Sequence, residues 1–419
     1  TRMRRTLSTP RARSFIASFT PRKAPSNYPQ IPPTIQKMKA THARLAALAT
    51  FAAVTTGSAV AETPIKIGVQ APITGEYAGE GQGIENAVRL LVEQRNAAGG
   101  ILGRKIEVTT CDDEGKAAQA AICARRLVNE GVVAVIGSYT SGAALAAAPI
   151  YTAANVIQTS DGSSDELTQR GYKTFFRNAP PNSAESAFTA EYLVKHKKYQ
   201  RIAVLADHSS FSSGLADSVQ KSVKAAGGNV VSTGFITAGS QDYTAVLTKI
   251  KSEGADVLYF AGYYPDGGLI RSQMVQLNMS APFVGGDANQ NVAFAKIAGK
   301  AAEGAVMVNT PAPESLPYPE AREFLASYKA KYHSTPPSIY TFTNADGLRA
   351  VFAAMAATKS ADASKLVDYM HQMKQFNGLT GAFGWDDKGE RIGSPFVAFE
   401  ITASGDYRTI YPAQQSASK

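Results

Sequence analysis

The sequence is poor in the residues that most enzyme active sites and metal centres use. It has five histidines, two cysteines and one tryptophan among 419 residues. The histidines are scattered without H-E-x-x-H spacing, and there is no C-x-x-C pair. A phosphate-binding G-x-x-x-x-G-K-[ST] loop and a G-x-S-x-G nucleophile elbow are also missing. We therefore expect no enzyme, no catalytic residue, no metal ion and no cofactor.

A glycine-rich stretch, Gly75 to Gly83, lies where a dinucleotide-binding fingerprint would lie, directly after the first expected strand. Neither Gly79 nor Gly81 begins a G-x-G-x-x-G motif, because the sixth positions are Ile84 and Asn86. The stretch therefore gives no reason to expect a nucleotide cofactor.

Acidic residues are missing from the N-terminal segment, since residues 1–61 contain ten Lys and Arg but no Asp or Glu. The formal net charge of the chain is +9, and the remaining residues carry 33 Lys and Arg against 34 Asp and Glu. A chain that is nearly neutral outside one segment has no basic field to attract a phosphate backbone. We therefore exclude nucleic acid as a partner.

The same segment has the organisation of a secretory signal peptide over residues 38–61. Basic residues follow Met38, apolar and small residues fill 45–60, and Ala59-Val60-Ala61 forms an A-x-A cleavage site. The apolar stretch is shorter than the roughly 20 residues that span a bilayer. Residues 1–37, rich in Pro, Arg and Ser, are expected to be a disordered upstream segment that is not translated in the native protein. We expect a soluble, periplasmic mature protein.

The two cysteines leave two interpretations open. Cys111 lies at the end of an expected strand and Cys123 lies 12 residues later, within the next expected helix. An exported protein can keep a disulfide. Cysteine is also a common small buried apolar residue, and the sequence does not give the geometry that a disulfide requires.

Strands and helices alternate along the chain in two series. The first series consists of strands at 65–70, 105–110 and 132–137 and helices at 83–96, 116–129 and 141–154. After a Pro-Pro break the second series has strands at 201–206, 229–235, 257–261 and 282–285 and helices at 183–196, 214–226, 243–252 and 267–277. After a second proline-containing break, at 310–313, helices are expected at 318–332 and 344–357. Such alternation predicts an α/β fold with two doubly wound parallel-sheet lobes, whose ligands bind at the carboxyl ends of the strands.

An ordered set of short motifs runs from residue 64 to residue 400. It includes Ala71-Pro72-Ile73-Thr74-Gly75, Asn96 to Ile101, Val135-Ile136-Gly137, Gly262-Tyr263-Tyr264-Pro265 and Trp385 to Gly389. No single motif is specific, but the ordered set resembles the type I periplasmic binding proteins of the leucine/isoleucine/valine-binding family.

The resemblance implies a clamshell whose lobes are joined by a three-crossing hinge and close over a ligand. It places the crossings near Pro180, Asn309 and Phe383. The lobes would then comprise 62–180 with 310–382 and 181–309 with 383–419. The sequence itself has proline-containing breaks at the first two crossings.

The resemblance also implies how an amino acid would be held. Ser141, in the loop that contains Tyr139 and ends at a helix start, matches the carboxylate-binding serine of the family. Ser163 matches the hydroxyl position of a second carboxylate-binding loop. Both serines could instead be ordinary helix caps. Asp287 matches the acidic residue that holds the ammonium group, although a surface turn also favours aspartate.

Three aromatic residues match positions in the wall of the family's ligand site, namely Phe211, Tyr263 and Tyr340. Two residues depart from the family pattern. Glu80 replaces an aromatic residue, and Asp161 replaces a small apolar one. If both face the ligand, a polar or cationic amino acid fits. If Glu80 turns outward from its loop, an aliphatic amino acid fits, and we rank branched-chain amino acids first.

The resemblance therefore predicts the substrate-binding component of an ABC importer. Its partners would be a small amino acid and the membrane permease and ATPase subunits, and the protein would be a monomer. The alternatives are a receptor for a polar or cationic amino acid, an amide or an aromatic acid, and a sensory ligand-binding protein.

Overall fold

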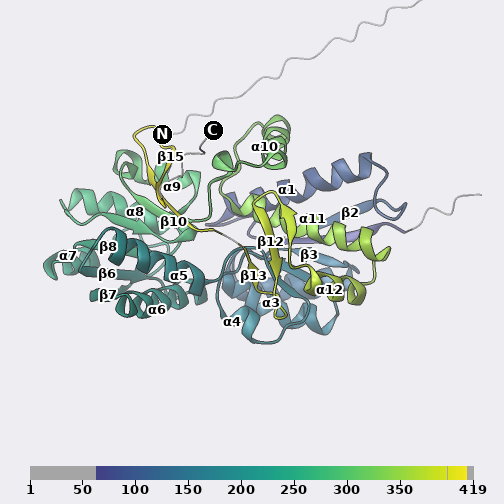
Figure 1. Cartoon of the computed structure of the whole chain (residues 1–419), viewed down its shortest axis with the longest axis horizontal. Helices are drawn as coiled ribbons and strands as arrows, with labels where there is room; N and C mark the ends of the chain where they lie inside the picture. The colour runs from purple at the N-terminus through teal and green to yellow at the C-terminus, as the bar shows by residue number, and fades with distance from the viewer. Residues whose placement is uncertain (1–62, 394, 413–419) are drawn as a thin grey trace, which may run out of the picture. The chain divides into compact units, whose positions relative to one another are not determined.

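A computed structural model describes residues 63–393 and 395–412, which belong to one compact unit (Figure 1). The predicted signal peptide at 38–61 and the segment 1–37 lie outside these residues. Within the described ranges, no helix is both long enough and apolar enough to cross a membrane.

The first lobe, called lobe 1, is built on a five-stranded parallel sheet in the order β2-β1-β3-β4-β5. Its strands are β1 (Ile65–Ala71), β2 (Ile106–Asp112), β3 (Ala134–Ile136), β4 (Ile157–Ser160) and β5 (Phe175–Arg177). Its helices are α1 (Ala78–Ala97), α2 (Ala117–Asn129), α3 (Ser141–Ala153), α4 (Glu166–Gln169), α10 (Pro319–Tyr332), α11 (Tyr340–Thr358) and α12 (Ala363–Gln372). Helices α2 and α3 cover one face, and α1 and α11 pack together on the other.

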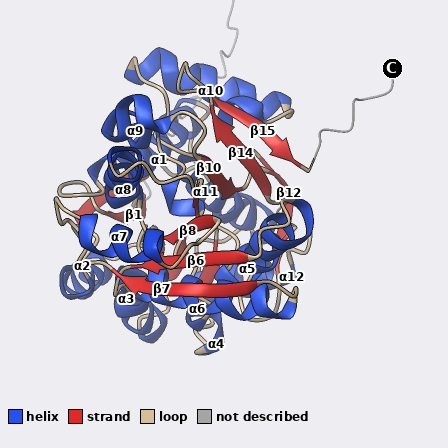
Figure 2. Cartoon of the chain, turned by 90° about the vertical axis from the view of Figure 1, so that its left-hand side faces the viewer, coloured by secondary structure: helices blue, strands red, loops and turns tan. Residues whose placement is uncertain are grey.

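The second lobe, called lobe 2, is built on a seven-stranded sheet in the order β15-β14-β10-β9-β8-β6-β7 (Figure 2). Its parallel strands are β6 (Arg201–Ala206), β7 (Asn229–Phe235), β8 (Val257–Ala261), β9 (Phe283–Gly285) and β10 (Val306–Asn309), and its antiparallel strands are β14 (Val397–Ile401) and β15 (Tyr407–Tyr411). The helices are α5 (Asn182–Ala190) with the π-helical η1 (Glu191–His196), α6 (Ser210–Ala225), α7 (Thr244–Ser252), α8 (Tyr264–Gln276) and α9 (Val292–Ala298). Short 3-10 turns η2 (Asp287–Asn289), η3 (Gly299–Ala302) and η4 (Pro313–Ser315) are the remaining helical segments of the described residues.

The predicted α/β fold with two mainly parallel sheets is confirmed. The chain passes between the sheets after β5 and after β10, where the proline-containing breaks lie. Strands β4, β5 and β10 and helix α12 were not expected. These strands are only three or four residues long, too short for a clear hydrophobic pattern.

The expected third crossing near Phe383 is wrong. Strands β11 (Phe376–Gly378), β12 (Gly381–Trp385) and β13 (Arg391–Ile392) form a small antiparallel sheet. This sheet packs on lobe 1, because the indole N–H of Trp385 donates to the carbonyl of Arg177 at 2.7 Å and Glu390 forms an ion pair with Arg177. The chain therefore returns to lobe 2 only between β13 and β14.

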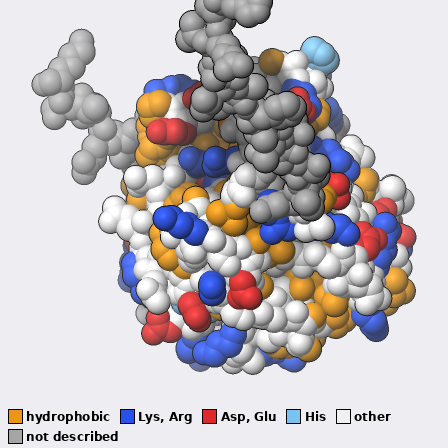
Figure 3. All heavy atoms as spheres, turned by 90° about the vertical axis from the view of Figure 1, so that its right-hand side faces the viewer, with side chains coloured by type: hydrophobic (Ala, Val, Ile, Leu, Met, Phe, Trp, Pro, Cys, Tyr) orange, Lys and Arg blue, Asp and Glu red, His pale blue; other side chains and the backbone are white. Residues whose placement is uncertain are grey.

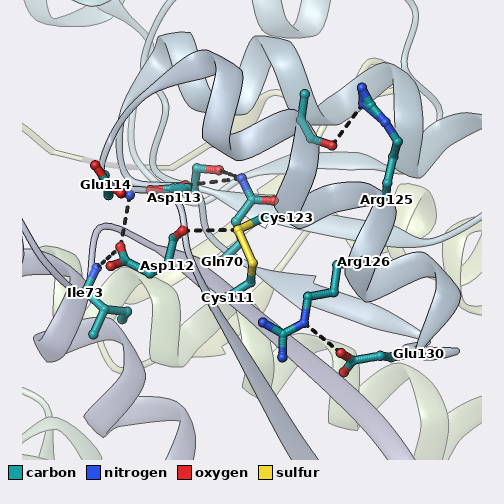
Figure 4. The surroundings of a disulfide bond; sticks show 12 residues. Gln70, Ile73, Cys111, Asp112, Asp113, Glu114, Cys123, Arg125, Arg126 and Glu130 are labelled. Atoms are coloured by element: carbon teal, nitrogen blue, oxygen red, sulfur yellow. Dashed lines mark hydrogen bonds and ion pairs between the residues drawn. A yellow bond between two sulfur atoms is a disulfide. The ribbon is translucent and has the colours of Figure 1, made fainter.

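The two cysteines form a disulfide between β2 and α2 (Figure 4). Their Cα atoms are 5.5 Å apart, and both side chains are buried with Leu127 and Val135 on the α2 side of the lobe 1 sheet. Both interpretations of the sequence thus hold in part, since the cysteines pair and also pack as apolar side chains.

Charged side chains of both signs lie on the face of the protein drawn in Figure 3. Many of the surface ion pairs are spaced one helical turn apart, as in Arg89 with Glu85 and Arg126 with Glu130. Such exposed pairs contribute little to stability. Because side chains of both signs are present, the face drawn in Figure 3 has no electrostatic field of a single sign.

Candidate functional site

Eight of the nine residues predicted to bind a ligand line one small cavity. Lobe 1 contributes Tyr139, Ser141, Asp161, Ser163 and Tyr340, and lobe 2 contributes Phe211, Tyr263, Asp287 and the additional Ala288. The serines and Asp287 follow strands β3, β4 and β9, so the cavity lies at the carboxyl ends of both sheets. Their role in binding a ligand stays a prediction.

The loop after β3 brings Ser141 to the cavity at the start of α3. The side chain of Thr140, and not that of Ser141, caps this helix by accepting from the N–H of Ala143. Gly137 has φ of +114°, and a Cβ there would lie 1.8 Å from the carbonyl oxygen of Gln70. Only glycine allows this close approach of the two strands. Because Thr140 caps the helix, Ser141 is free of the capping role and lies at the positive end of the α3 dipole.

The loop after β4 places Ser163 next to Ser141. The two loops are joined, because the hydroxyl of Ser141 accepts from the N–H of Ser164 at 3.1 Å. The guanidinium of the fully buried Arg177 holds the loop by donating to the carbonyls of Gly162 and Ser164. Arg177 was not singled out from the sequence, since nothing in its local pattern distinguishes it from a surface arginine.

Asp161 faces the cavity and is bound to helix α11. Its carboxyl accepts from the hydroxyl of Thr343 at 2.7 Å and from the side-chain amide of Asn344. Burial raises the pKa of Asp161 well above its ordinary value, and the hydrogen bonds and Arg391 oppose this shift. A polar group therefore forms part of the wall contributed by lobe 1.

The expectation that Glu80 turns outward from a loop is wrong. Glu80 lies in the first turn of α1, is 1% exposed and does not line the cavity. Its carboxyl accepts from the side-chain amide of Asn291 in lobe 2 at 2.6 Å and from the hydroxyl of Ser338 at 2.7 Å. Burial raises its pKa to about 7. Glu80 therefore joins the two lobes beside the cavity.

Asp287 is buried in lobe 2, with 3% of its surface exposed. One of its carboxyl oxygens accepts from the N–H of Ala288 at 2.7 Å. Burial raises the pKa of Asp287 to about 6, although the hydrogen bond from the N–H of Ala288 and the neighbouring side chains of Tyr340 and Glu185 oppose this shift. Asp287 is therefore a buried carboxyl without an ion-pair partner among the described residues, which is the environment that a ligand's ammonium group would complete.

Aromatic rings from both lobes meet at the cavity. The ring centroid of Tyr263 in lobe 2 lies 4.9 Å from that of Phe211, 5.9 Å from that of Tyr139 and 4.6 Å from that of Tyr77, and Tyr139 lies 5.5 Å from Tyr340. The hydroxyl of Tyr139 is buried and has no hydrogen-bond partner among the described residues. Tyr77 was not predicted, because it precedes α1 in a stretch read only for its glycines.

Within the part of the chain that the structure describes, no group of three or more His, Cys, Asp or Glu side chains could hold a metal ion. The polar groups at the cavity are instead hydroxyls and carboxyls that face one another across the two lobes.

A family model, sequence relatives and solved structures all match this chain to periplasmic or substrate-binding proteins. The family model described as periplasmic binding protein matches residues 64–406. The leucine/isoleucine/valine-binding protein homolog 3 of Brucella melitensis is 30% identical over 352 residues, which are 84% of this chain and 95% of the relative. The leucine-specific-binding protein of Salmonella typhimurium is 31% identical over 345 residues, covering 81% of this chain and 92% of the relative.

Solved structures give the same result. The branched-chain amino acid transporter substrate-binding protein LivJ of Streptococcus pneumoniae, in complex with isoleucine, matches with a TM-score of 0.76 and 28% identity over 83% of this chain and 99% of that chain. The leucine-binding protein LivK of Thermotoga maritima matches with a TM-score of 0.77 and 27% identity over the same shares. From its fold, its sequence and the site between its lobes, this chain belongs to the periplasmic binding protein family.

Proposed function

We propose that this chain is the substrate-binding component of an ABC importer and that it binds a small amino acid, with branched-chain amino acids ranked first. The observation that carries the proposal is that two hydroxyls and a helix N-terminus on one wall of the cavity face the carboxyl of Asp287 on the other wall. Ser141 and Ser163 lie on lobe 1 beside a helix N-terminus, and the carboxyl of Asp287 lies on lobe 2. A zwitterion would bridge the lobes and stabilise their closed arrangement.

The magnitudes support this assignment. A hydrogen bond to a charged group contributes about 1.5–3 kcal/mol, so three or four such bonds supply the roughly 8 kcal/mol of micromolar affinity. The rings of Phe211, Tyr263 and Tyr340 and the methyl group of Ala288 offer an apolar surface to the rest of the molecule. The relatives named for leucine, isoleucine and valine favour an aliphatic side chain.

A specific observation favours a second candidate, an amino acid with a polar or cationic side chain. Asp161 lines the cavity and is a buried carboxyl. A ligand group that donates a hydrogen bond to Asp161 would lower the cost of burying it. Glu80 no longer supports this candidate, because its carboxyl is bound to Asn291 and Ser338 outside the cavity.

The remaining parts of the proposal follow from this role. The protein would act in the periplasm after removal of residues 38–61, as a monomer without catalytic activity. Its macromolecular partners would be the permease and ATPase subunits of the importer.

The test is a binding screen on the purified mature protein. Mass spectrometry would identify any compound retained through purification, and calorimetry would then compare L-leucine, L-isoleucine and L-valine with L-lysine, L-glutamine and benzoate. Tight binding of the branched-chain amino acids alone supports the first candidate, and preference for L-lysine or L-glutamine supports the second. Binding of benzoate without any amino acid would contradict both.

A further inference from the structure

A second buried carboxyl lies behind the wall that lobe 2 contributes to the cavity. Glu185, in the first turn of α5, is 1% exposed. One of its oxygens, Oε1, accepts from the N–H of Asp287 at 3.1 Å and from the hydroxyl of Tyr259 at 2.8 Å. A Cβ on Gly286 would lie 2.7 Å from this oxygen, so only glycine at position 286 allows the backbone to come this close to Glu185. Glu185 thus supports the segment that carries Asp287.

The segment has a second support at the second crossing between the lobes, after β10. The side-chain amide of Asn309, at the end of β10, donates to the carbonyl of Asp287 at 3.0 Å and to the side-chain carbonyl of Gln290 at 2.8 Å. Asp287 is therefore fixed through its own backbone by residues that lie beside the first and second crossings.

The two carboxyl groups are buried neighbours, because the backbone N–H of Asp287 lies 3.1 Å from Oε1 of Glu185. Two ionised carboxylates close together at a buried site repel, so such a pair retains one proton and carries one negative charge. The other oxygen of Glu185, Oε2, is buried and has no hydrogen-bond donor among the described residues. A proton on Oε2 fits this arrangement, because Oε1 already accepts two hydrogen bonds.

The surroundings assign the proton to Glu185 and the charge to Asp287. Asp287 lines the cavity, where a cation of a ligand can reach it, whereas Glu185 is enclosed behind it and has no hydrogen-bond partner at Oε2 among the described residues. Burial and the charge of Asp287 also raise the pKa of Glu185 well above its ordinary value. The other titratable groups that act on the pair are hydroxyls of raised pKa, which stay neutral: Tyr259 of β8, Tyr340 of α11, Tyr139 before α3 and Tyr263 before α8.

We propose that Glu185 is a positioning residue that remains protonated, orients Asp287 and limits the pair to one negative charge. Lobe 2 then presents a single charge, which matches the single charge of one ammonium group. This inference rests on the proposed function for the identity of its ligand, but the protonation of Glu185 does not depend on any ligand.

The chain offers a matched control in the same lobe. Asp266 is likewise buried and accepts from a backbone N–H, that of Gly239 at 2.9 Å, and from a tyrosine hydroxyl, that of Tyr243. Asp266 does not line the cavity. The substitution D266N therefore perturbs a similar hydrogen-bonded carboxyl without touching the proposed pair.

The first measurement is calorimetric titration at pH 7.5 with L-leucine and with 4-methyl-2-oxopentanoate, which has the same skeleton but no ammonium group. We expect E185L to weaken L-leucine binding by about tenfold or more, because Asp287 loses the acceptor that orients its backbone N–H. E185Q, which retains an acceptor for this N–H and adds no charge, should recover most of this loss. Binding of the oxoacid should change little in either variant, and D266N should bind L-leucine like the wild type.

The second measurement needs no ligand. Under this proposal Glu185 is ionised in the unfolded chain at neutral pH and protonated in the folded protein. Folding of the chain therefore takes up one proton at Glu185. The dependence of the unfolding free energy on pH, between about pH 6 and 8, should therefore show about one proton less taken up on folding by E185Q than by the wild type. Circular dichroism establishes that each variant is folded.

Two results would overturn the inference. If the affinity of folded E185Q for L-leucine falls as far as that of E185L, the binding of L-leucine requires the negative charge of Glu185 itself. If the proton uptake of E185Q equals that of the wild type, Glu185 is not the protonated group. A wild-type protein that binds no amino acid would contradict the proposed function instead, and the proton measurement would still decide the state of Glu185.

Discussion

The two walls of the cavity hold polar groups in different ways. On lobe 1 the hydroxyls of Ser141 and Ser163 lie in two loops that are joined to each other and to Arg177 by hydrogen bonds. On lobe 2 a single carboxyl, that of Asp287, rests on a second buried carboxyl. On lobe 1 the two hydroxyls are available to a carboxylate, and the nearby carboxyl of Asp161 is already hydrogen-bonded to Thr343 and Asn344. On lobe 2 one carboxyl is available to an ammonium group. The wall of lobe 2 should therefore be the more sensitive to substitution and to pH.

The largest expected effect is that of D287N, which removes the charge but keeps the shape of the side chain. Removing one partner of a buried charge pair costs about 2–5 kcal/mol, so the affinity for L-leucine should fall by roughly 30-fold or more. Calorimetry with L-leucine and its oxoacid measures this directly. Affinity for L-leucine within threefold of the wild type would remove Asp287 from the site.

The corresponding change on lobe 1 is S141A, with S163A as a second test. Loss of one hydrogen bond to a charged carboxylate costs about 1.5–3 kcal/mol, or roughly tenfold or more in affinity. These variants should weaken the binding of L-leucine and of the oxoacid alike, since both ligands have the carboxylate. The control is S232A, because the hydroxyl of Ser232 is buried in β7 without a hydrogen-bond partner among the described residues. Selective loss of L-leucine would contradict the assignment of the serines to the carboxylate.

The walls should also differ in their response to pH. Because the pKa of Asp287 is about 6, its charge is lost as the pH falls below this value, and the affinity for L-leucine should drop by about tenfold per pH unit. The stability of the free protein should change in the opposite direction. A carboxyl with a raised pKa in the folded state contributes stability at low pH, and this contribution is lost as the pH rises through about 6. A D287N variant with the same pH profile as the wild type would exclude Asp287 as the source.

The smallest expected effect comes from the contact that joins the lobes outside the cavity. E80A removes hydrogen bonds to Asn291 and Ser338 that have lengths of 2.6 and 2.7 Å. Because Glu80 does not line the cavity, the affinity for L-leucine should fall only by about threefold to tenfold, through a less stable closed state. The conservative variant E80Q should restore most of it, and small-angle scattering should show more of the open form in E80A alone. An E80A variant with unchanged affinity would mean that this contact does not contribute to closure.

Much of the fold and of the cavity could be predicted from the sequence. The alternation of strands and helices placed the two sheets, and the resemblance to a known family named eight residues that line one cavity. Local patterns are sufficient here, because parallel strands bring their following loops to one edge of a sheet. Short strands such as β4 and β5 had too few residues to show a pattern.

Local sequence patterns are enough to identify the fold class, the absence of the usual catalytic motifs and the residues that follow the strands. The burial of Glu80 between the lobes, the packing of residues 383–392 on lobe 1 and the position of Glu185 against Asp287 depend on contacts between distant segments. The reason is physical. A carboxyl has the same local pattern whether it faces water or a buried partner, and its charge is set by burial and by neighbours that are distant in the sequence.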